Sequence, residues 1–137
     1  MKDFREEKSA KTPSFFSLLD FCGISNKQKE SLVKMGDEMK ETVRYCLHKN
    51  VGDSLHVMLI YHPYKKEIGE QIFNHTDSYY FLLDGAFKLI NLQDKSEIIF
   101  DFKTYFIGKI GKNIPYKMEI MSDKLLFIEV RERNTKG

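Results

Sequence analysis

The sequence has 137 residues, which is the size of a single domain with a hydrophobic core of its own. Hydrophobic residues make up 42% of the chain and charged residues 31%, so the composition excludes a wholly disordered protein. The net charge of +2 results from 22 basic and 20 acidic residues without a basic stripe, which excludes the electrostatic pattern of a nucleic-acid-binding protein.

The sequence carries no signal for secretion or for a membrane span. The segment from Met1 to Lys8 is charged and lacks the apolar region of a signal peptide, and no apolar run approaches the roughly 20 residues of a transmembrane helix. Cys22 and Cys46 lack the spacing of a metal site, which favours two reduced thiols. We therefore expect a cytoplasmic protein with no membrane partner.

The N-terminal part is predicted to contain a tail and two helices. Residues 1–13 are polar and lack periodicity, so we expect a flexible tail or an arm that pairs with a partner. Residues 14–48 would form the helices. A helix-start signal at Pro13 precedes an apolar segment that ends at Gly23, which predicts a short helix docked on the main domain or on a second subunit. Apolar residues at helical spacing predict a second helix from Ser25 to about Arg44.

Residues 49–133 have the pattern of an antiparallel β-domain. The periodicity changes from that of a helix to that of a strand after Tyr45. The predicted strands are residues 54–62, 69–75, 79–83, 86–92, 96–101, 104–108, 114–121 and 124–131. Asp84-Gly85 predicts a tight hairpin within this series. Short strands with turns at such spacing predict a small antiparallel sandwich or barrel behind the two helices.

The stretch from Gly69 to Gly85 contains the most informative side chains. It has the pattern of a strand, a polar bend, a second strand and a turn. Phe73 and His75 share one face of the first strand, and Tyr80 lies on the second. This layout resembles the first sequence motif of the cupin superfamily.

A longer part of the chain is similar to the WbuC-type cupins, small proteins named after bacterial surface-polysaccharide gene clusters. The similarity covers roughly residues 25–131 and includes Arg44, the element Cys46-Leu-His48-Lys and a final strand Phe127-Ile-Glu-Val130. It implies an all-β fold, a cupin-type antiparallel β-barrel or jelly roll behind the N-terminal helices. It also implies a role in surface-polysaccharide synthesis and, because small cupins commonly dimerise, a homodimer.

The resemblance also implies that most of a cupin's metal-binding side chains are missing. The first motif usually has two histidines separated by one residue and then a glutamate, and the second motif adds a histidine. Phe73, His75 and Ser78 stand at the first three of these positions, and the fourth falls near Tyr116. Since one of four ligands remains, we expect neither a metal nor another cofactor.

Other histidines could replace the missing ligands. His56 and His62 share a face of strand 54–62, and His48 lies just upstream. They could turn inward and join His75, or His56 and His62 could be surface or edge residues on a half-exposed strand. The candidate ligand-binding residues are therefore His48, His56, Phe73, His75, Ser78, Tyr80 and Tyr116.

Three functions remain open. The first is binding of a small, carbohydrate-related molecule in an aromatic-lined barrel mouth, or an accessory role in polysaccharide assembly. The second is a metal-free sugar-nucleotide isomerase or epimerase with His75 as base and Tyr116 as acid, although tyrosines such as Tyr80 could equally be packing residues. The third is a metal-dependent cupin enzyme. We expect no cluster of inward-pointing arginines to bind a pyrophosphate, since the chain has only Arg5, Arg44, Arg131 and Arg133, and this places the binding function first.

Overall fold

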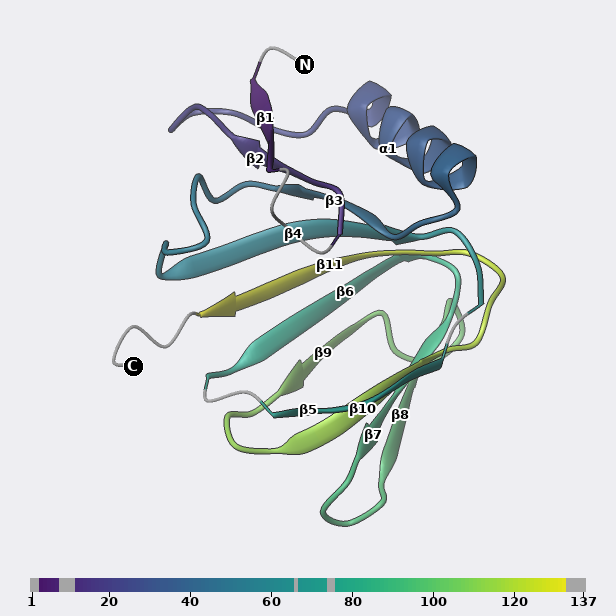
Figure 1. Cartoon of the computed structure of the whole chain (residues 1–137). Helices are drawn as coiled ribbons and strands as arrows, with labels where there is room; N and C mark the ends of the chain where they lie inside the picture. Colours follow the sequence, from purple (N-terminus) through teal and green to yellow (C-terminus); the bar gives the residue numbers. More distant parts are fainter. Residues whose placement is uncertain (1–2, 8–11, 66, 74–75, 133–137) are drawn as a thin grey trace.

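Two β-sheets face each other in this computed structural model, and a helix covers the outer side of the larger sheet (Figure 1). The structure describes residues 3–7, 12–65, 67–73 and 76–132, and segment 67–73 is described by its backbone alone. The part of the chain after residue 42 is built from strands and turns wherever it is described, which confirms the all-β expectation.

The larger sheet has the strand order β1-β2-β3-β4-β11-β6-β9. Its strands are β1 (Phe4–Glu7), β2 (Ser14–Ser17), β3 (Val43–Cys46), β4 (Leu55–His62), β6 (Ser78–Asp84), β9 (Ile107–Ile110) and β11 (Leu125–Glu132). Neighbouring strands pair antiparallel except β2 and β3, which run parallel. The smaller sheet has the order β5-β10-β7-β8, with β5 (Glu67–Phe73), β7 (Phe87–Asn91), β8 (Glu97–Phe100) and β10 (Pro115–Ile120).

The helix predicted to begin at Ser25 is present as α1 (Asn26–Met39). Ser25 caps it, because its side chain accepts a hydrogen bond from the backbone N–H of Gln28 while the Gln28 side chain accepts one from the N–H of Ser25. The helix ends earlier than predicted, since Lys40 adopts the left-handed conformation at φ 55° and the chain turns into β3.

The expectation of two N-terminal helices is wrong, because residues 14–17 form the strand β2 instead of a helix. Phe15 and Phe16 are both buried, but they belong to two different cores on opposite sides of the sheet. A strand sends consecutive side chains to opposite faces, whereas a helix would have placed this pair on one side. Within the region expected to be a tail, residues 4–7 form β1, which pairs with β2.

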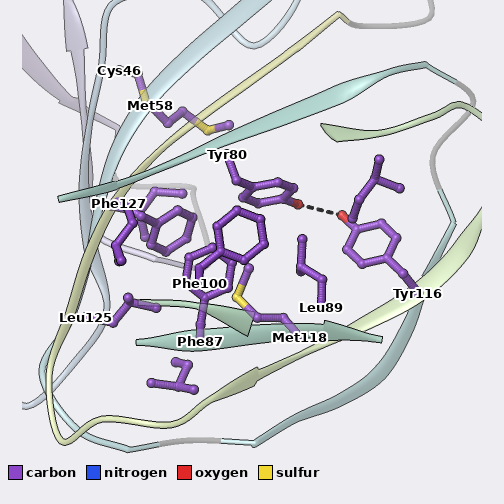
Figure 2. Close-up of a cluster of buried hydrophobic side chains, with 14 of the residues drawn as sticks. Cys46, Met58, Tyr80, Phe87, Leu89, Phe100, Tyr116, Met118, Leu125 and Phe127 are labelled. Carbon is purple, nitrogen blue, oxygen red and sulfur yellow. Dashed lines mark hydrogen bonds between the residues drawn. The ribbon is translucent and has the colours of Figure 1, made fainter. Parts of the chain in front are cut away.

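Two hydrophobic cores hold these layers together. The inner core lies between the sheets (Figure 2) and consists of Phe16, Cys46, Met58, Ile60, Tyr80, Leu82, Phe87, Leu89, Phe100, Ile110, Tyr116, Met118, Ile120, Leu125 and Phe127. The outer core lies beneath α1 and consists of Phe4, Phe15, Leu32, Val43, Tyr45, Leu59, Tyr61 and Leu126. Since alternate residues of β4 and β11 belong to different cores, the inward-facing side chains of the larger sheet can be identified by position.

The turns explain where the strands of the second half begin and end. Gly85 has φ 95° and lies in a tight turn between β6 and β7. The predicted hairpin at Asp84-Gly85 is wrong, because β6 belongs to the larger sheet and β7 to the smaller one, so the turn leads the chain from one sheet to the other. The strand predicted at 104–108 lies at Ile107–Ile110 instead. Asp101 causes this shift, because its carboxylate accepts hydrogen bonds from the backbone N–H groups of Lys103 and Thr104 and holds these residues in a turn.

Candidate functional site

Tyr80 and Tyr116 meet at the centre of the molecule. Tyr80 comes from β6 in the larger sheet and Tyr116 from β10 in the smaller one, and their hydroxyl oxygens are 2.7 Å apart (Figure 2). Both side chains are buried, and burial raises the pKa of Tyr80 well above its ordinary value. The Tyr80 phenol is therefore uncharged at neutral pH, and its hydrogen bond with Tyr116 joins the sheets across the inner core.

The residues aligned with the cupin metal motif are only partly described. Ser78 is fully buried at the start of β6, on the same inward face as Tyr80. Phe73 ends β5 and pairs in the ladder with Pro115, which places its backbone beside Tyr116, but its side chain is not described. His75 lies outside the described residues, so the acid–base pair of His75 with Tyr116 stays a prediction.

His48 and His56 form a stacked pair, with ring centroids 4.1 Å apart and planes 10° from parallel. The backbone N–H of Val57 donates to Nδ1 of His48 at 3.2 Å, and Nε2 of His56 donates to the carbonyl oxygen of Val51 at 2.9 Å. Burial, together with the nearby His56 and Arg44, lowers the pKa of His48 to about 4. His48 is therefore neutral at physiological pH.

The interpretation of His56 and His62 as residues of a half-exposed strand is wrong. His56 is 8% exposed and His62 is 7% exposed, and both lie on the face of β4 that points inward with Met58. His62 stacks against Phe127 of the inner core at 5.8 Å and forms a 2.6 Å hydrogen bond with the hydroxyl of Thr42. The structure thus brings His48 and His56 together, with His62 further along the same strand face.

Charged residues also face the inner core, at the end where β4 and β6 begin and β11 ends. Glu129 of β11 lies directly between Met58 of β4 and Tyr80 of β6 in the sheet. Arg131 occupies the next inward position, between His56 and Ser78. Directly paired residues of an antiparallel sheet point to the same side, so Glu129 and Arg131 share the side of Tyr80. We call this set of inward-facing residues, Ser78, Tyr80, Glu129 and Arg131, the polar end of the barrel.

Arg44 adds a second guanidinium to this region. It pairs with Ile60 of the inner core, donates from Nε to the hydroxyl of Ser14 at 2.6 Å and contacts the sulfur of Met58 through Nη1 at 3.3 Å. Arg44 and Arg131 both lower the pKa of Glu129, while the expectation that no arginine cluster binds a pyrophosphate stays a prediction.

The Glu129 carboxyl group is held in an unfavourable environment for a charge. Its side chain is 13% exposed, and burial raises its pKa, an effect that the nearby Arg131 and Arg44 partly oppose. The Nε atom of Arg131 lies 3.7 Å from Oε2 of Glu129, which is an ion pair without a hydrogen bond. The sequence did contain a signal for this site, since Leu125, Phe127, Glu129 and Arg131 share one face of a strand.

Glu129→Gln is expected to make the stability of the protein less sensitive to pH. Burial raises the pKa of the Glu129 carboxyl in the folded state. The folded protein therefore loses stability as the pH rises from the pKa of this group in the unfolded chain through its pKa in the folded protein. Glutamine cannot ionise, so the variant should be more stable than the wild type by about 1–3 kcal/mol near pH 8 and nearly equal to it near pH 4.

Urea unfolding across this pH range would measure the difference. Glu132→Gln is the matched control, because Glu132 is exposed on the same strand, and its effect should stay within about 0.5 kcal/mol. A constant difference between Glu129→Gln and the wild type at all pH values would contradict the assignment.

Two hollows adjoin the predicted residues. The smaller, about 90 Å³, is lined by Leu89, Ile90, Asn91, Ser96, Ile98, Lys109, Ile110, Ile114 and Tyr116. The larger is an open groove of about 520 Å³ outside the barrel, lined by Leu19, Asp20, Cys22, Leu47, His48, Lys49, Asp53, Ser54 and Leu55. Ligand pockets commonly measure about 300–1,000 Å³, so the hollow at Tyr116 admits only one end of a ligand.

Metal ligands do not converge in the part of the chain that the structure describes, since no three His, Cys, Asp or Glu side chains there could share an ion. His75, the one residue that matches the cupin metal motif, lies outside that part. Of the described residues, no helix has the length and apolar character needed to cross a membrane.

The comparisons with known proteins concern the fold. No protein-family model matches the sequence, and no curated protein matches it. A cupin superfamily protein from Desulfitobacterium hafniense is similar in structure, with a TM-score of 0.56 and 10% identity over 68% of this chain and 78% of that chain.

Two further cupins give similar values. An RmlC-like cupin family protein with a double-stranded β-helix fold from Methanocaldococcus jannaschii has a TM-score of 0.55 and 17% identity, over 71% of this chain and 84% of its own. The cupin domain of Cnp3 from Schizosaccharomyces pombe has a TM-score of 0.54 and 10% identity, over 69% of this chain and 66% of that chain. These likenesses show that the protein has a cupin-like fold, and at such identities they show the fold alone.

Proposed function

We propose that this cupin-fold protein binds a small, carbohydrate-related molecule at the polar end of its barrel. The observation that carries the proposal is the buried, hydrogen-bonded pair of Tyr80 and Tyr116, with Ser78, Glu129 and Arg131 at neighbouring inward positions of β6 and β11. Binding sites for small molecules are mostly apolar and contain a few polar groups that orient the ligand. A few hydroxyl and charged groups within an aromatic core fit a ligand that has both hydroxyls and apolar ring faces.

The WbuC-type resemblance supports a setting for this activity. The sequence elements that carry it include Arg44, His48 and Glu129, which lie at or near the polar end. We propose an accessory or binding role in surface-polysaccharide synthesis, in which the protein holds a sugar or a sugar derivative.

A metal-free isomerase is the second candidate. The Tyr80–Tyr116 hydrogen bond favours it, because a phenol held 2.7 Å from another can donate a proton to a ligand and be resupplied through its neighbour. Exchange of solvent deuterium into a deoxy-ketosugar nucleotide, lost in His75→Ala, would identify this activity and replace simple binding as the function.

The binding function can be tested by calorimetry with monosaccharides, their acids and nucleotide sugars. Tyr116→Phe should weaken the affinity for a bound sugar by about tenfold, because one hydrogen bond contributes about 1–1.5 kcal/mol. Tyr64→Phe is the matched control, since Tyr64 is 44% exposed in a loop, and should bind like the wild type.

Two results would count against the proposal: no binding by any compound of the panel, or equal affinities of Tyr116→Phe and the wild type. The Tyr116→Phe protein is first shown to be folded by circular dichroism, because the Tyr80 hydroxyl loses its partner in this variant.

A further inference from the structure

We propose that the ligand carries an acidic group as well as hydroxyl groups, and that Arg131 binds the acid while Glu129 accepts hydrogen bonds from the hydroxyls. This inference rests on the proposed binding function and names the chemical class of the ligand, a sugar acid or a sugar phosphate.

The carboxylate of Glu129 is short of hydrogen-bond donors from the described part of the protein. Its side chain is only 13% exposed, and no donor of the described residues lies within hydrogen-bond distance of it. Its nearest cationic nitrogen is Nε of Arg131, at 3.7 Å. A carboxylate largely removed from water needs hydrogen-bond donors to offset the lost hydration. Ligand hydroxyls at the polar end would supply these donors.

The second step concerns Arg131. Its side chain is 38% exposed, and its strand position lies on the inward side of the sheet. Its ion pair with Glu129 is formed through Nε, so the terminal nitrogens are not part of that contact. A guanidinium presents a planar set of donors that matches a carboxylate or a phosphate with two parallel hydrogen bonds.

The third step concerns the charge balance. Arg44 and Arg131 both act on Glu129, so two permanent positive charges face one carboxyl group. The stacked His48 is neutral at physiological pH and does not alter this balance. Arg44 is fixed by Ser14 and Met58, which keeps its charge near the site without making it the main ligand contact. Two guanidinium groups that interact with one carboxyl group favour an anionic ligand.

The fourth step concerns spacing. Glu129 and Arg131 are two residues apart on one face of β11, and their side chains approach each other to 3.7 Å between Oε2 and Nε. A ligand whose acidic group lies close to a hydroxyl group, as in a sugar acid or a sugar phosphate, can contact both side chains. A simple anion lacks the hydroxyl groups that Glu129 would accept hydrogen bonds from, and a neutral sugar lacks the acidic group that Arg131 would bind.

The test is calorimetric titration with three sets of probes. Glucuronate and galacturonate represent sugar acids, glucose 6-phosphate represents sugar phosphates, glucose and galactose are the neutral sugars, and acetate and inorganic phosphate are the simple anions. The acidic sugars should bind at least about tenfold more tightly than the neutral sugars, because hydrogen bonds to charged groups contribute about 1.5–3 kcal/mol. The tighter binding of either the sugar acids or the sugar phosphate would identify the acidic group of the ligand as a carboxylate or a phosphate.

Two variants separate the roles. Arg131→Gln should abolish the preference for acidic over neutral sugars. Glu129→Gln should weaken the affinity for both kinds of sugar by about tenfold. Glu132→Gln, exposed on the same strand, is the control and should change neither. Since Glu129→Gln is expected to raise stability, a loss of binding in this variant cannot be attributed to unfolding.

The outcomes distinguish this inference from the proposed function. Equal affinity for neutral and acidic sugars in the wild type would overturn the inference and leave the binding function intact. Acetate or phosphate binding as tightly as the acidic sugars would overturn the role of Glu129. If no compound of any set binds, the proposed function fails and this inference fails with it.

Discussion

Replacing Phe87 with alanine is expected to lower the free energy of unfolding by about 3–5 kcal/mol. Phe87 is fully buried, stacks on Phe100 with ring centroids 4.4 Å apart and lies 5.6 Å from Phe127 and 6.1 Å from Tyr80. Its removal would leave a cavity where β6 and β11 of the larger sheet meet β7 and β8 of the smaller one, and the surrounding rings can fill it only in part. Urea denaturation at neutral pH would measure the loss.

The matched control for this variant is Phe102→Ala. Phe102 is the same residue type but is 73% exposed, so its replacement should change the free energy of unfolding by less than about 0.5 kcal/mol. The free energy of unfolding of a domain is typically about 5–15 kcal/mol, so the Phe87→Ala protein would retain little stability. A loss below about 1 kcal/mol would show that the inner core does not depend on this ring stack.

Gly85→Ala is expected to destabilise the protein by about 4 kcal/mol, which combines left-handed backbone strain with a steric clash. Gly85 has φ 95°, and an added Cβ would overlap the backbone carbonyl oxygen of Lys124 and approach the hydroxyl of Ser122. The carbonyl belongs to the turn before β11 and has no side-chain freedom with which to move away. At roughly 4 °C per kcal/mol, the melting temperature should fall by roughly 15 °C.

Gly23→Ala is the control for the glycine variant, since a Cβ at Gly23 meets nothing within 4 Å. It should leave the melting temperature nearly unchanged. If both variants melt together with the wild type, the turn between β6 and β7 tolerates a side chain and its described geometry is wrong.

The strands could be predicted because local chemistry determines them. Alternate residues of β4 and β11 pack into the inner and the outer core, and alternate residues of β6 are buried and more exposed. The Asp84-Gly85 turn contains glycine, the residue type that adopts a left-handed backbone at low cost. The helix α1 was equally visible through its Ser25 cap and its buried Leu32.

The first predicted helix failed for a reason that local chemistry cannot reveal. Phe15 and Phe16 lie in a continuous apolar run, and such a run is compatible with a helix or with a strand buried on both faces. The pairing of β2 with the distant strand β3 decides for a strand. Phe15 lies beside Tyr45 in the outer core, and Phe16 lies beside Cys46 in the inner core.

The candidate site was predictable only in part. Tyr80 and Tyr116 were both named as candidate ligand-binding residues, but the predicted pair was His75 with Tyr116, and the hydrogen bond between the two tyrosines was not anticipated. Glu129 and Arg131 were not singled out, although they share a strand face with Phe127. Their electrostatic environment depends on Arg44 of β3. Arg44 lies near them because β3 pairs with β4 and β4 pairs with β11, and the spacing of residues in the sequence does not indicate these pairings.

The position of β11 has a consequence for how the chain acquires its structure. Among the described strands β11 comes last in the sequence, yet it lies in the larger sheet between β4 and β6. A ribosome that has released residues up to Asp84 has supplied both neighbours but not the strand that joins them. Synthesis must therefore reach residue 132 before the sheet can close, and until then two partial sheets with open edges depend on slow, long-range pairing.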